Sequence, residues 1–217
     1  MRCLIIGLGA MIRQKKYFSG ESYHGHVPFN LSGIPILSAV YEGMVREIVV
    51  AKLEAEAIST SSSHKYAVHL RKQAEHKGGI ENLKKLYQPV FGCGLFDVVD
   101  NQDRTAVCQS LKAMVALRNV FAHGTILIYP DEEISSEIDG GFVKDWEIQL
   151  KNTVSKYFKE TYDSENVINV LQENDVLEGF VDQLKVLAKS LQAEHGDLGI
   201  KSPGLISNYK YGFSNSL

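Results

Sequence analysis

Three polar side chains suited to phosphate chemistry stand close together at the end of an apolar stretch. Arg118, Asn119 and His123 all lie within the segment Leu117–Gly124. An arginine can hold a phosphate through two parallel hydrogen bonds and stabilise the negative charge that develops on it. A histidine titrates near neutral pH and can exchange protons with a hydroxyl or a leaving oxygen. Because both residue types are costly to bury without partners, the segment predicts a site for RNA phosphodiester chemistry.

A helix must position these side chains. Apolar residues recur at helical spacing from about Asp103 to His123, and Gly124 follows where a left-handed cap residue is expected. Arg118 falls on or beside the apolar stripe of this helix. Arg118 and His123 are separated by about 140° around an ideal helix. Both can therefore reach one atom only if the helix end unwinds or a second copy of the helix faces the first.

A purely structural interpretation of the same residues stays open. Arg118 can pair with a buried carboxylate inside the protein. His123 can cap the carboxyl end of its helix, where a positive charge is favourable. In that case neither side chain acts on a substrate.

No other pattern predicts a bound metal or cofactor. Leu4–Ala10 resembles the opening of a dinucleotide-binding fingerprint, but Ile12 takes the third glycine position and no strand–helix–strand unit follows. His24 and His26 stand in a glycine-containing loop without an acidic or cysteine partner pattern. The other histidines and the three cysteines lack spacing typical of metal ligands. We therefore expect neither a metal nor a cofactor.

Composition limits the class of protein. The chain has 217 residues, 44% hydrophobic and 23% charged, which suits one globular domain. Its net charge of −3 argues against a general polyanion-binding protein. A basic run remains, for which a solvated helix face is the favoured interpretation. It contains Lys65, Arg71, Lys72, Lys77, Lys84 and Lys85.

The same composition predicts a cytoplasmic protein. No apolar run approaches the ~20 residues needed to cross a bilayer. The three cysteines are odd in number and widely spaced, which is typical of reduced thiols. The apolar start of the chain is followed by basic residues and has no convincing cleavage site, so we do not expect a signal peptide.

Hydrophobic periodicity predicts a mainly helical fold. A first helix is expected over residues 2–15, with a strand as the alternative, followed by a loop from Tyr17 to Ser32. Pro35 would lie in the first turn of the next helix, which runs from Ile36 to about Ile58. The remaining helices are expected at 64–77, 80–87 and 103–123, and from Asp175, where capping-box spacing opens a last helix that ends at Gly196.

A change of period predicts a small β element after the Arg118 helix. Thr125–Tyr129 is rich in β-branched and aromatic residues, and Trp146–Leu150 alternates apolar and polar as a partner strand would. We expect one domain over residues 1–196, with this β insertion at about 125–150. Residues 197–217 are expected to form a C-terminal tail.

The segment Leu117–Gly124 resembles the signature of the HEPN superfamily, in which a histidine follows an arginine after four to six residues. Asn119, Ala122 and Gly124 add further matches in the form RNxxAHG. The likeness covers residues 35–195 by architecture, but only the motif helix by specific residues. It implies a HEPN-like helical bundle.

The resemblance also implies an activity and partners. It implies a metal-independent endoribonuclease with Arg118 and His123 as catalytic residues and Asn119 in support. The 2′-hydroxyl of RNA attacks the adjacent phosphorus in such enzymes, which often work as homodimers in toxin–antitoxin or phage-defence systems. An antitoxin or defence partner is therefore expected beside RNA. Thr125 stands where one variant of the family carries a modified tyrosine.

Glu42 is the second feature that carries the resemblance. It lies inside an apolar early helix and is similar to the acidic position of HEPN domains that faces the motif helix. Two alternatives stay open. Glu42 can form an exposed i, i+4 pair with Arg46, and Glu47 competes for the same role.

Two other functions remain as alternatives. The chain can be a noncatalytic HEPN-like module that binds a nucleotide, RNA or a protein partner. It can also be a helical interaction domain whose motif match is accidental. An enzyme requires Arg118 and His123 to line one cleft.

Overall fold

The computed structural model describes residues 4–7, 10–11, 26–58, 64–76, 79–122 and 150–209. Within these ranges the regular structure is helical and contains no strand, so the fold is mainly α. None of the described helices is both long and apolar enough to cross a membrane.

The helices follow one another along the chain with short connections. Their bounds are α2 Val27–Ile58, α3 His64–His76, α4 Ile80–Phe91, α5 Asn101–Ala122, the π-helix η1 Leu150–Ser155, α7 Lys156–Tyr162, α8 Val167–Glu173, α9 Val176–His195, the 3₁₀ helix η2 Gly196–Leu198 and α10 Ser202–Asn208.

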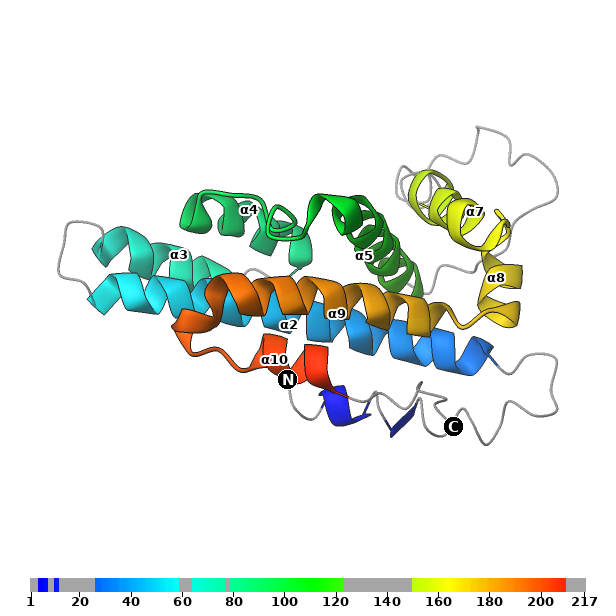
Figure 1. The fold of residues 1–217 in the computed structure, drawn as a ribbon, viewed down its shortest axis with the longest axis horizontal. Helices are drawn as coiled ribbons and strands as arrows, with labels where there is room; N and C mark the ends of the chain where they lie inside the picture. Colours follow the sequence, from blue (N-terminus) through cyan, green and yellow to red (C-terminus); the bar gives the residue numbers. More distant parts are fainter. Residues whose placement is uncertain are drawn as a thin grey trace.

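Two long helices form the axis of the molecule. α2 and α9 lie side by side, with α4 and α5 packed on one side of the pair and α10 on the other (Figure 1). α3 packs along α2 at one end, and α7 and α8 lie toward the opposite end. The core fills the space between these helices. Its fully buried large side chains include Tyr41, Met44, Tyr87, Phe158 and Phe180.

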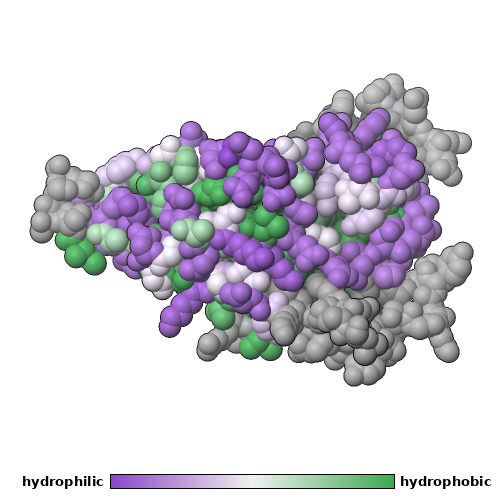
Figure 2. Space-filling view, viewed as in Figure 1, coloured by the Kyte–Doolittle hydropathy of each residue, from purple (hydrophilic) through white to green (hydrophobic). Residues whose placement is uncertain are grey.

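Hydrophilic side chains cover most of the described face shown in Figure 2, with smaller hydrophobic patches between them. Ile58, at the end of α2, is 80% exposed. Single exposed apolar residues are ordinary on protein surfaces, so this one by itself marks no binding site.

A buried asparagine joins the start of α2 to the junction of α8 and α9. The Asn30 side-chain amide donates to the backbone carbonyls of Leu171, at 2.7 Å, and Asn174, at 3.0 Å. Its oxygen accepts from the backbone N–H of Leu177 at 3.1 Å. All the hydrogen-bonding groups of this fully buried side chain are therefore used, which is what a buried amide requires.

The predicted loop from Tyr17 to Ser32 is wrong over its described last part. α2 begins at Val27, and Pro35 lies inside it rather than in its first turn. A proline in a helix interior costs a backbone hydrogen bond, but contacts with α9 hold the turns before it. A Cβ added to Gly33 would lie 2.4 Å from a methyl carbon of Leu177. Tertiary packing thus overrides the local loop pattern.

Two other helices differ from expectation. α4 continues through Pro89 to Phe91, where Gly92, with φ of 76°, donates its N–H to the Gln88 carbonyl and ends the helix. The segment expected as a tail contains α10, which packs on α9. The last helix predicted from Asp175 is confirmed as α9, and the Asp175 carboxylate accepts from the backbone N–H of Glu178.

The predicted β-hairpin lies almost wholly outside the described residues. Leu150, the last residue of its expected second strand, begins the π-helix η1 instead. An apolar–polar alternation of five residues is too short to separate a strand from the end of a helix.

Candidate functional site

Arg118 and Asn119 lie in the last turns of α5, and both are half-buried. The Arg118 guanidinium donates to the Asn119 side-chain oxygen at 3.0 Å. Among the described residues, Arg118 has no carboxylate within ion-pair distance. The alternative in which a buried acid neutralises Arg118 therefore finds no partner in this part of the chain.

The packing of α5 explains why the arginine lies where it does. Leu117 and Val120, on either side of the Arg118–Asn119 pair, are completely buried. α5 packs on both α2 and α9, so its last turns are anchored on the core. Arg118 emerges beside this buried stripe, as the helical spacing predicts. Its guanidinium is thus held at the edge of the core with unused donors.

His123 lies outside the described residues, as does Gly124, since the described part of α5 ends at Ala122. The convergence of Arg118 and His123 stays a prediction.

Glu42 is engaged at a junction of three helices. Its carboxylate accepts from the Arg46 guanidinium at 2.6 Å and from the backbone N–H of Gly79, at the start of α4, at 3.2 Å. Arg46 also donates to the carbonyl of Glu75 in α3 at 3.0 Å. The geometry therefore matches the i, i+4 alternative for Glu42. The competing candidate, Glu47, is exposed on α2.

The sequence pattern does not bring Glu42 to Arg118 by any contact between described residues. The hydrogen bonds of Glu42 lead to α3 and α4, whereas that of Arg118 stays within α5. The observed site is therefore the Arg118–Asn119 pair alone.

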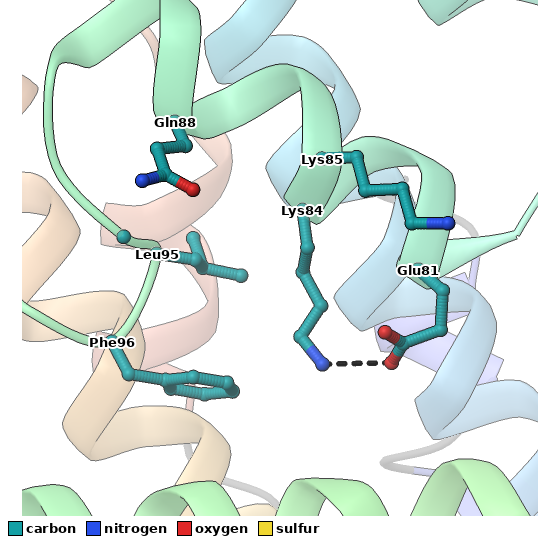
Figure 3. Close-up of a pocket in the computed structure, with 7 residues that line it drawn as sticks. Glu81, Lys84, Lys85, Gln88, Leu95 and Phe96 are labelled. Carbon is teal, nitrogen blue, oxygen red and sulfur yellow. Dashed lines mark hydrogen bonds and ion pairs between the residues drawn. The ribbon is translucent and has the colours of Figure 1, made fainter.

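A shallow groove lies between α4 and the loop after it (Figure 3). Its volume is about 270 Å³. Lys84 points across it, with its ammonium 2.7 Å from the Glu81 carboxylate and 5.4 Å from the centre of the Phe96 ring. A charge that already has a carboxylate and an aromatic face is poorly available to an anionic ligand. None of the predicted site residues lines this groove.

A buried tyrosine–histidine pair escaped the sequence analysis. The Tyr87 hydroxyl is hydrogen-bonded to Nε2 of His195, whose ring lies 4.4 Å from that of Phe91, between centroids. Burial lowers the pKa of His195 and raises that of Tyr87. These residues are on α4 and α9, so no spacing along the chain could have indicated the pair.

No group of three or more histidine, cysteine or acidic side chains that could hold a metal occurs in the described ranges. Comparison of the chain with family models, curated proteins and solved structures finds no match. The site therefore has to be interpreted from its own chemistry.

Proposed function

We propose that the chain is a metal-independent endoribonuclease of the HEPN type, with Arg118 and His123 as its catalytic residues. The observation that carries the proposal is the state of Arg118. A permanent cation sits half-buried at the edge of the core and has no carboxylate partner among the described residues. Such a group is suited to binding an anion that the protein does not itself supply.

The mainly helical fold supports the same proposal. A HEPN-like domain carries its motif on a helix of a bundle, and α5 is a helix packed against the two long helices. The hydrogen bond from Arg118 to Asn119 gives the asparagine a definite task. It fixes one edge of the guanidinium, so that the remaining N–H groups can face a phosphate.

The proposed reaction needs one base, one acid and one anion-binding group. The 2′-oxygen forms a bond to the adjacent phosphorus, the 2′-hydroxyl proton passes to a base, and the bond from phosphorus to the 5′-oxygen breaks. A proton then goes to that leaving oxygen. The products are a 2′,3′-cyclic phosphate and a 5′-hydroxyl. His123 exchanges these protons, and Arg118 stabilises the charge on the phosphoryl oxygens.

We place the active form in a homodimer. Arg118 and His123 point in directions about 140° apart on an ideal helix, so a second α5 can supply the missing group. An antitoxin or defence-system partner in the cytoplasm would then act by covering this pair or by preventing the two copies from meeting.

RNA cleavage by the purified protein tests the proposal. In the presence of EDTA, we expect the wild type to leave 2′,3′-cyclic phosphate ends, and Arg118→Ala and His123→Ala each to lower the rate by at least about 100-fold. Lys112→Ala, an exposed change on the same helix, is the matched control and should cut at the wild-type rate.

Cleavage that survives both substitutions, or that needs a metal, would contradict the proposal. A protein that binds RNA without cutting it under any of these conditions would favour the noncatalytic alternative. Circular dichroism of each variant separates loss of chemistry from loss of fold.

A further inference from the structure

The solvent-facing side of α3 carries an uninterrupted line of basic and imidazole side chains. We call the line formed by Lys65, His69, Lys72 and His76 the α3 stripe. All four residues are exposed. Their spacings of four, three and four residues bring them within about 60° of one another around an ideal helix.

The α3 stripe lies opposite the buried side of its helix. The buried residues of α3 are Ala67, Leu70 and Ala74, which pack toward α2. The stripe therefore projects into solvent from the end of the bundle farthest from α7 and α8 (Figure 1).

The charges of the stripe are not neutralised within the described chain. Neither Lys65 nor Lys72 forms an ion pair there. The one arginine of α3, Arg71, turns instead to Glu54 of α2, at 3.0 Å, and to Glu75, at 2.9 Å. This pairing removes the acidic side chain of α3 from the stripe and leaves its lysines free.

Charge complementarity selects a polyanion, and an aromatic neighbour selects its kind. Tyr66 follows Lys65 and is 61% exposed. An exposed ring beside lysines can stack an unpaired base while the lysines hold the backbone, which is how single-stranded nucleic acid is bound. A duplex keeps its bases stacked on one another and makes no use of the ring.

We infer that the α3 stripe binds the phosphate backbone of single-stranded RNA. Lys65 and Lys72 supply two phosphate contacts, His69 and His76 donate N–H groups between and beyond them, and Tyr66 stacks on a base. The inference goes beyond the proposed cleavage and stands whether or not Arg118 and His123 cut RNA. The protein as a whole is acidic, so this face gives RNA a local foothold on it.

Binding of a 2′-O-methylated single-stranded RNA with a fluorescent label tests the inference. This probe lacks the 2′-hydroxyl nucleophile and is not a substrate for the proposed cleavage, so binding and catalysis are measured separately. In fluorescence anisotropy at about 50 mM salt, we expect the double substitution Lys65→Gln and Lys72→Gln to weaken binding about tenfold. The slope of log affinity against log salt should fall by about 1.4, since each contact to a single strand contributes about 0.7.

The matched control removes the same charge elsewhere. Lys156→Gln with Lys189→Gln changes two exposed lysines on α7 and α9 and should bind within about twofold of wild type. The charge reversal Lys65→Glu with Lys72→Glu should abolish binding, and Tyr66→Ala should weaken it without changing the salt slope.

Several results would overturn the inference. They are failure of the wild type to bind the probe, equal losses in the control and stripe variants, and preference for duplex RNA. Binding of anionic phosphatidylserine vesicles in place of RNA would assign the stripe to a membrane surface instead. All the changed side chains are exposed, so loss of folding is checked simply by comparing thermal unfolding.

Discussion

The chemistry of single residues is most constrained where a polar group is buried, and His195 is the sharpest example. Its imidazole lies in the C-terminal turn of α9 against Phe91 and is hydrogen-bonded to Tyr87. Burial lowers its pKa, and the nearby Lys52 acts in the same direction, whereas Glu194 and Asp197 act in the opposite direction. The neutral ring is therefore part of the folded structure.

This environment predicts a pH dependence of stability. Because the pKa of His195 is lower in the folded state than its ordinary value of 6.5, the unfolded chain binds the proton more readily. The contribution is fully present above about pH 6.5 and is lost as the pH falls toward the folded pKa. We expect His195→Gln, which keeps a polar partner for Tyr87 but cannot titrate, to reduce the loss of stability between about pH 7.5 and 5.5.

Urea unfolding at each pH measures this effect. His69→Gln is the matched control, because His69 is an exposed histidine on the surface of α3. An identical pH dependence in wild type and His195→Gln would show that the buried imidazole has no part in it.

At the scale of elements, the strongest tie joins α2 to the connection between α8 and α9. The three hydrogen bonds of Asn30 satisfy two carbonyls and one N–H in a part of the chain where the helices end. Such groups have no helical partners of their own. The side chain thus replaces the backbone bonds that two helix ends lack.

Asn30→Ala should therefore lower the free energy of unfolding by about 2–4 kcal/mol, because it leaves buried backbone groups unsatisfied. Asn166→Ala removes an exposed N-cap of α8, whose oxygen accepts from Asn169, and should cost only about 1 kcal/mol. Chemical denaturation compares the two. Equal losses would mean that Asn30 serves merely as another cap.

The elements also indicate how far sequence reasoning reaches. Periodicity predicts α3, α5 and α9 well, because each combines an apolar stripe with a recognisable end. It fails for the first turns of α2 and for α10, whose helical state depends on packing against residues distant in the chain. Gly33 against Leu177 is such a contact. No local pattern contains the information that a partner surface supplies.

The candidate site divides in the same way. The position of Arg118 beside the buried stripe follows from helical spacing alone. The capture of Glu42 by Gly79 does not, because it depends on how α4 begins beside α2. The line of residues in the α3 stripe was present in the sequence as part of a basic run, but its separation from Arg71 required the ion pairs.

At the scale of the whole molecule, the segment after α9 is an integral part of the fold. Ile206 of α10 is completely buried, and α10 packs on both α9 and α2. Ile206→Ala should lower the free energy of unfolding by about 2–4 kcal/mol by opening a cavity in the core.

The exposed change Asn208→Ala, on the same helix, should alter the free energy of unfolding by less than about 0.5 kcal/mol. Thermal unfolding should remain a single transition in both variants. A stability for Ile206→Ala equal to that of wild type would restore the expectation of a loosely attached tail.

The length of α2 sets a minimum size for anything that touches both ends of the protein. Its 32 residues extend for about 48 Å at 1.5 Å per residue. At about 3.4 Å per nucleotide, a stacked single strand needs about 14 nucleotides to cover that distance. The helix is thus a ruler: a mononucleotide or a short oligomer can occupy one end of the molecule, and only a longer strand can engage both ends at once.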